Sequence, residues 1–169
     1  LIATGRSINK ERMKDQYVVL RAMAFLMLHR GEFKDIPALQ YRGDIDDFLA
    51  RFMVYVNDNA PEKLIVDYEN LFIRCMQISY DLLGENGFRF SGNGIRRPIN
   101  MPLFEALSYL FSFVPEKIDY TWASRLILDI ESVKEEFDDS RYFSGNIDST
   151  TSVSFRFDRM DKIINRIQL

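Results

Sequence analysis

The chain has 169 residues, 47% of them hydrophobic, and a formal net charge of -3, which together indicate one folded domain and exclude a disordered chain. A single cysteine excludes an internal disulfide, and one cysteine with one histidine cannot supply the four ligands of a structural zinc site. The apolar runs are shorter than the roughly 20 residues of a membrane span and no secretory signal is visible, so we expect a cytoplasmic protein.

Apolar residues recur at helical spacing along most of the chain, which predicts an all-α fold of about six helices. Eleven of the twelve residues from Tyr17 to Leu28 are apolar or aromatic, so we expect the helix 9–30, capped by Asn9, to lie at the centre and to be covered on all sides. Residues 1–8 are predicted to be a linker or incoming segment, and 9–169 a single helical domain. In chain order, the predicted helices span 9–30, 45–56, 61–83, 101–114, 119–137 and 150–167.

Arg21 is the exception within the apolar run. A buried guanidinium needs carboxylate or carbonyl partners, because removing it from water alone costs several kcal/mol. The pattern allows a structural ion pair with Glu105 or Asp129, and it also allows a contact with a bound anion.

An irregular loop over 84–100 holds four of the eight glycines and three arginines, Arg89, Arg96 and Arg97. Glycines let backbone N–H groups approach an anion, arginines bind phosphates, and aromatic rings stack on bases. These features predict a nucleic-acid contact. The alternative is an ordinary interhelical loop with Phe88 and Phe90 anchored in the core.

The last helix has four basic residues at spacings of three, three and four: Arg156, Arg159, Lys162 and Arg166. Such spacing gives one continuous face, which can follow a nucleic-acid backbone or an acidic partner. Asp158 and Asp161 dilute its charge, so a solvated face is the alternative interpretation.

No catalytic or metal-binding constellation is evident in the sequence. Adjacent carboxylates such as Asp46 and Asp47 diverge by about 100° on a helix and do not converge on one atom. Cys75 lies on the inward side of its predicted helix, and we interpret it as an inert core thiol rather than the partner of His29.

Three separated stretches carry a family resemblance: 9–15 leading to Val19-Leu20-Arg21, then 98–107 (PINMPLFEAL), and finally 151–157 (TSVSFRF). Their order and spacing resemble the helical C-terminal half of a bacterial domain-of-unknown-function family. Its members have an N-terminal ParB-like domain with an Asp-Gly-Gln-Gln-Arg motif, and they include GmrSD-type restriction enzymes and related phage-defence proteins.

The resemblance implies that nucleotide hydrolysis or DNA cleavage, with a nucleotide and Mg as its cofactors, belongs to an N-terminal domain that this sequence lacks. The Asp-Gly-Gln-Gln-Arg motif is absent here, so no catalytic residue is carried over and no cofactor is expected in this fragment. By resemblance, a polar network is expected in or beside the core. Its members are Arg12, Asp15, Arg21, Asn100, Glu105, Thr151 and Arg156.

The leading hypothesis is therefore a non-catalytic helical module of a ParB-like restriction or phage-defence protein, whose partner is the missing N-terminal domain. A second hypothesis is a nucleic-acid-binding module that uses the 88–97 loop and the basic face of the last helix, with DNA as its partner. A third is a protein–protein interaction scaffold.

Overall fold

The computed structural model describes residues 13–90, 96–139 and 145–167. These residues form six α-helices and two short 3-10 turns, with no strand among them, which confirms the all-α prediction. In chain order the elements are α1 (Lys14–His29), η3 (Pro37–Leu39), α2 (Ile45–Asp58), α3 (Glu62–Leu83), η4 (Gly84–Asn86), α4 (Met101–Phe111), α5 (Tyr120–Asp138) and α6 (Thr150–Ile167).

Local side-chain chemistry explains where three of the helices begin. The side-chain oxygens of Asp44, Asn100 and Asp119 each accept a hydrogen bond from a backbone N–H in the first turn, of α2, α4 and α5 respectively. Such caps satisfy donors that have no partner inside the helix.

The start of α1 differs from the prediction. The helix begins at Lys14 rather than after Asn9, because Met13 at its N-cap position adopts a left-handed conformation (φ 52°) that interrupts a helical run. Asn9 lies outside the described residues.

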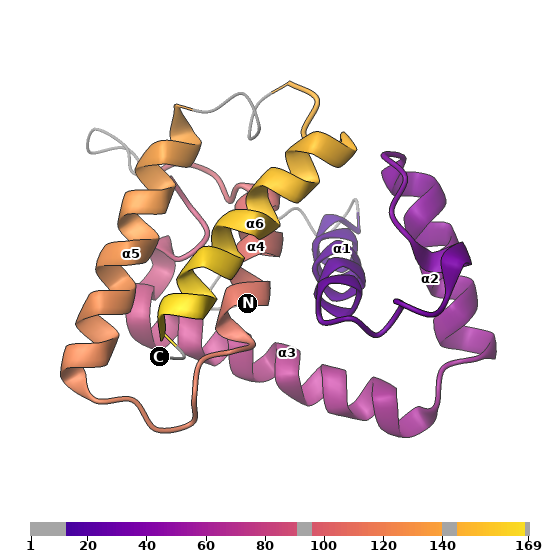
Figure 1. Cartoon of the computed structure of the whole chain (residues 1–169), viewed down its shortest axis with the longest axis horizontal. Coiled ribbons are helices and arrows are strands. Elements are labelled where there is room, and N and C mark those ends of the chain that lie inside the picture. The colour runs from indigo at the N-terminus through magenta and orange to yellow at the C-terminus, as the bar shows by residue number, and fades with distance from the viewer. Residues whose placement is uncertain (1–12, 91–95, 140–144, 168–169) are drawn as a thin grey trace.

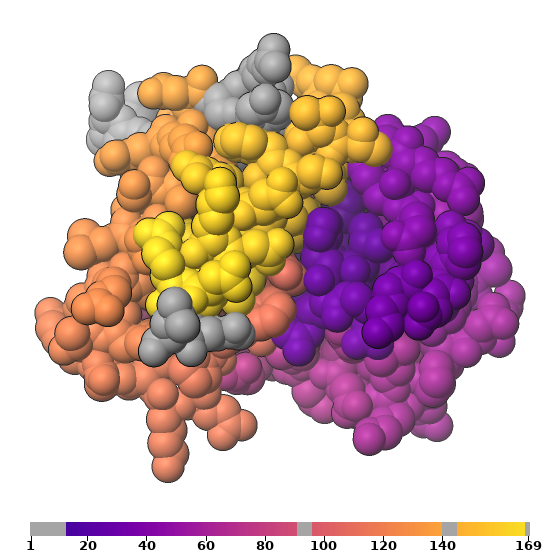
Figure 2. Space-filling model, viewed as in Figure 1, coloured from indigo at the N-terminus to yellow at the C-terminus, as the bar shows by residue number. Residues whose placement is uncertain are grey.

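The centre of the core is shared by α1 and α4. Every residue of α4 from Pro102 to Phe111 is buried, and apart from Glu105 and Ser108 these residues are apolar or aromatic. Figure 1 shows α6 crossing α4, with α5 on one side and α1 on the other. In the space-filling view, α6 lies at the surface between α5 and the pair α1 and α2 (Figure 2).

Two helices contribute less to this core. α3 is the longest helix, yet only Tyr68, Cys75 and Ser79 on it are buried. It follows α2 in the chain and runs below α1 (Figure 1). α2 itself packs on the outer side of α1. Among the described residues, no helix is long and apolar enough to cross a membrane.

Candidate functional site

A buried ion cluster joins three helices at the centre of the molecule. Arg21 of α1 places its Nε 2.5 Å from Oε1 of Glu105 on α4, and Arg156 of α6 places its Nη2 3.2 Å from Oε2 of the same carboxylate. Arg21 is 2% exposed, and Glu105 and Arg156 have no exposed surface. Because solvent does not reach these groups, the cluster holds the helices together and does not present a carboxylate to a substrate.

The segment before α6 covers one side of the ion cluster. Asp148 accepts from Nη2 of Arg21 across 2.6 Å, and its backbone oxygen accepts a hydrogen bond from the hydroxyl of Tyr41. The backbone oxygen of Ile147 accepts from Nη1 of Arg156 across 2.6 Å. The cluster therefore anchors two segments to the core: the connection after η3, through Tyr41, and the segment before α6, through Ile147 and Asp148.

The electrostatics of the cluster are balanced, with two guanidinium groups beside two carboxyl groups. Complete burial raises the pKa of Glu105, while the charges of Arg21 and Arg156 act in the opposite direction. Burial and the charge of Asp148 raise the pKa of Tyr41 to about 12, so this hydroxyl stays protonated and acts as a donor.

His29 and Cys75 do not have the properties of a catalytic pair. The ring of His29 stacks on Phe157 with centroids 3.5 Å apart, and burial together with the charge of Arg156 lowers the pKa of His29 to about 3. Burial raises the pKa of Cys75 to about 12, so its thiol is protonated at neutral pH. These environments agree with the interpretation of Cys75 as a core thiol.

The structure brings together only part of the polar network that the resemblance implied. Arg21, Glu105 and Arg156 meet as described, so of the two partners expected for Arg21 the structure has Glu105, while Asp129 pairs with Arg166. The other described members, Asp15, Asn100 and Thr151, do not join this cluster. Asn100 caps α4, Thr151 is exposed on the first turn of α6, Asp15 accepts from the backbone N–H of Gln16, and Arg12 lies outside the described residues.

Sequence reasoning missed Tyr41 and Asp148 as members of the cluster. Both lie in connections between helices, where no periodic pattern indicates which way a side chain points. The only available signal was the need of buried Arg21 for more than one acceptor.

The arginines of the 84–100 loop are held by the protein itself. Arg89 is buried and donates to the backbone oxygens of Glu85 and Arg97, and burial lowers its pKa. Arg96 pairs with Glu85 across 2.9 Å, and Arg97 pairs with Asp138. Phe88 and Phe90 are both buried, as the ordinary-loop interpretation expects, while residues 91–95 lie outside the described part of the chain.

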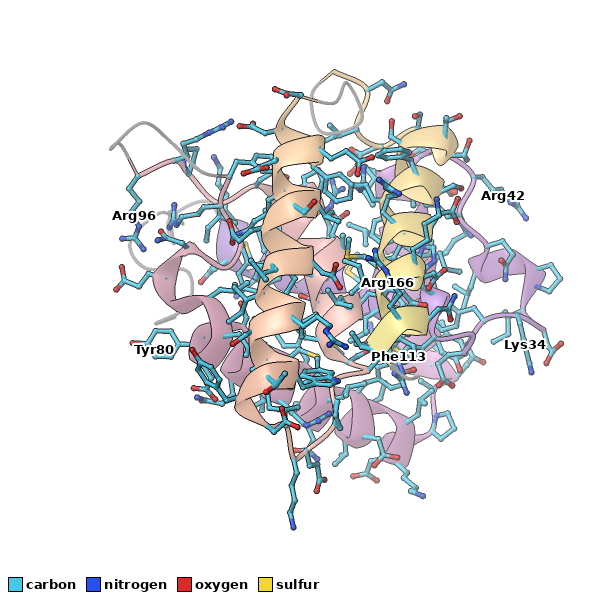
Figure 3. The ribbon with its side chains drawn as sticks, turned by 60° about the vertical axis from the view of Figure 1, so that its left-hand side comes forward. Lys34, Arg42, Tyr80, Arg96, Phe113 and Arg166 are labelled. Atoms are coloured by element: carbon cyan, nitrogen blue, oxygen red, sulfur yellow. The ribbon has the colours of Figure 1, made fainter. Side chains whose placement is uncertain are left out.

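The basic residues of α6 do not form one solvent face. Arg156 is completely buried because it binds Glu105, so the prediction that it belongs to an exposed basic face is wrong. Arg159 pairs with Glu136 and Arg166 with Asp129 of α5, while Lys162 is exposed. Figure 3 shows Arg166 between α5 and α6 and Arg96 at a distant edge of the molecule. The two predicted basic regions are therefore separate.

An apolar groove lies along α1, between that helix and the helices α2 and α3. Its volume is about 800 Å³. Nearly all its lining is apolar, and four of the seven methionines contribute to it. The lining residues are Met13, Asp15, Gln16, Tyr17, Val19, Leu20, Met23, Met27, Phe52, Met53, Val56, Ile65 and Tyr68.

The groove is open to solvent rather than a closed core cavity. Val19 is 41% exposed and Met53 is 44% exposed, whereas Met27 on its floor is 1% exposed. A mostly apolar pocket of this volume is typical of binding sites. Sequence reasoning treated this side of α1 as covered, and so it missed the groove.

Comparison with protein-family models, curated proteins and solved structures finds no match to this chain. Within the described residues, no group of three or more His, Cys, Asp or Glu side chains could hold a metal ion.

Proposed function

We propose that this chain is a non-catalytic helical module that docks another protein domain in the groove along α1. The observation that carries the proposal is the open, methionine-rich apolar lining beside α1, α2 and α3. Burying such a surface in a complex is favourable by about 25 cal/mol for each Å² of apolar area removed from water.

The ion cluster supports the same function from inside the module. It fixes α1 against α4 and α6 through Arg21, Glu105 and Arg156, so the groove side of α1 is presented on a rigid element. A preorganised surface loses less conformational entropy when it binds.

The family resemblance supplies the identity of the docked domain in this proposal. A ParB-like domain with an Asp-Gly-Gln-Gln-Arg motif would occupy the groove, and the whole would act in restriction or phage defence in a bacterial cytoplasm. Nucleotide hydrolysis or DNA cleavage would then belong to that domain.

The test begins with the coding sequence upstream of Leu1, where an Asp-Gly-Gln-Gln-Arg motif is expected. The upstream domain and this chain are then expressed as separate polypeptides, and their affinity is measured by isothermal titration calorimetry. Substituting both Val19→Gln and Met53→Gln should weaken binding at least about tenfold, which corresponds to about 1.4 kcal/mol.

A matched control replaces two exposed apolar residues away from the groove, Ile118→Gln and Leu128→Gln, and should leave the affinity unchanged. The proposal fails if the upstream sequence lacks the motif and its product does not bind. It also fails if the purified chain alone cleaves DNA or hydrolyses nucleotide.

A further inference from the structure

The described charged residues around the groove are mostly acidic. Asp15 lines the groove on α1, and on α3 the exposed Glu62 and Glu69 lie one turn before and one turn after Ile65 of the lining. On α2, the exposed Asp46 lies two turns before Met53 and therefore on the same side of that helix. All three walls of the groove thus have acidic residues beside their apolar lining.

Most basic residues of the described helices beside the groove point elsewhere or are engaged. Lys63 precedes Ile65 of the lining by two positions, which places it near the opposite side of α3, whereas Lys14 lies next to Asp15 at the start of α1. Arg51 pairs with Asp47, and Arg74 donates to the backbone oxygen of Val114. From Asp44 to Glu69 the chain has seven acidic residues and two basic ones, so the segment that forms the α2 wall and the start of the α3 wall has a net negative charge.

The lining itself is suited to a helical ligand. Met13, Met23, Met27 and Met53 are unbranched and polarisable, so they adapt to side chains of varied shape. A groove between helices accepts the apolar face of an amphipathic helix, whose anchors recur every three or four residues.

We infer that the groove along α1 binds a basic amphipathic helix of a partner protein. Apolar residues of that helix would enter between α1, α2 and α3, and its Lys or Arg residues would lie beside Asp15, Asp46, Glu62 and Glu69. This inference rests on the proposed docking function and specifies the chemistry of the docked element.

The test uses methionine methyl NMR of the full chain, with a designed helical peptide that has Leu on one face and Lys on the other. We expect the methyl signals of Met13, Met23, Met27 and Met53 to shift on titration. The signals of the methionines that do not line the groove, Met76, Met101 and Met160, should stay in place and serve as internal controls.

Charge is tested separately from the apolar contact. A peptide with the same Leu face and Glu in place of Lys should bind at least about tenfold more weakly, as should the Leu/Lys peptide to a Glu62→Lys, Glu69→Lys variant. The matched variant Glu116→Lys, Glu135→Lys makes the same change in net charge on exposed residues that do not flank the groove, and it should keep the affinity.

Each other outcome overturns the inference in a distinguishable way. If a Leu/Gln peptide binds as tightly as the Leu/Lys peptide, the groove docks helices without regard to charge and only the proposed function stands. If no groove methyl shifts with any peptide, the basic-helix inference fails, and calorimetry with the upstream domain judges the docking function independently. Self-association that Met53→Gln abolishes would assign the groove to a second copy instead.

Discussion

The Nε atom of Arg21 lies 2.5 Å from Oε1 of Glu105, and this contact joins α1 to α4 where neither side chain reaches solvent. Replacing Glu105 by Gln removes the negative charge and leaves the guanidinium groups of Arg21 and Arg156 facing each other in the core. Breaking a buried pair in this way costs about 3–5 kcal/mol. We therefore expect Glu105→Gln to lower the free energy of unfolding by about that amount in urea titrations.

The matched control is Asp129→Asn, which removes the partner of Arg166 from an ion pair at the surface. Exposed pairs contribute about 0–1 kcal/mol, so this variant should unfold at nearly the same urea concentration as the wild type. Equal stability of Glu105→Gln and wild type would show that Glu105 is already protonated in the folded state.

His29 should make the protein sensitive to mild acid. Burial and the charge of Arg156 lower the pKa of His29 from its ordinary value of 6.5 to about 3. In that interval the unfolded chain binds a proton that the folded chain does not. The contribution of His29 to the free energy of unfolding is therefore fully present above about pH 6.5, and it is lost as the pH decreases toward 3. The loss per pH unit is about 1.4 kcal/mol.

A His29→Phe variant tests this prediction, because it keeps a ring against Phe157 and removes the titrating group. As this is the only histidine, the free energy of unfolding should fall by about 2 kcal/mol between about pH 7 and about pH 5 in the wild type and much less in the variant. An unchanged slope in His29→Phe would contradict the lowered pKa.

Gly87 is required by a close approach to α3. A Cβ placed on Gly87 would overlap Oγ of Ser79, which is buried. We expect Gly87→Ala to destabilise the fold by about 1–3 kcal/mol through overpacking, as measured by thermal unfolding.

If the clash with Ser79 is the cause, a second substitution at Ser79 should restore the stability lost in Gly87→Ala. The Ser79 hydroxyl has no hydrogen-bond partner among the described residues, so Ser79→Ala alone should be close to neutral. In the double variant Ser79→Ala, Gly87→Ala the stability should return toward that of the wild type. If the stability changes of the two single variants simply added in the double variant, the contact between Ser79 and the new Cβ would not be the cause of the destabilisation.

The helices could be predicted because their signals are local. Apolar periodicity located all six, and Asp44 and Asn100 marked two of the starts through an interaction within four residues. A carboxylate partner for Arg21 could also be anticipated, because a charge in an apolar run must have a partner, but the sequence left Glu105 and Asp129 both open.

What could not be predicted depends on where helices pack in space. Arg156 follows the same spacing as Arg159, yet α6 turns it toward Glu105 and turns Arg159 toward Glu136. The groove arises because α2 and α3 leave one side of α1 open, although the apolar run from Tyr17 gave no sign of which side that would be.

Nucleic-acid binding through the predicted basic residues should be weak, because three of their arginines are already paired with carboxylates. Arg97 binds Asp138, Arg159 binds Glu136 and Arg166 binds Asp129, so a phosphate would have to displace a carboxylate from each. In fluorescence anisotropy with duplex DNA, we expect little binding by wild type and stronger, salt-sensitive binding when the three carboxylates are replaced by their amides. Tight binding by wild type that falls steeply with salt, and that is lost on replacing Arg96 and Arg97 by Ala, would instead favour the nucleic-acid-binding hypothesis.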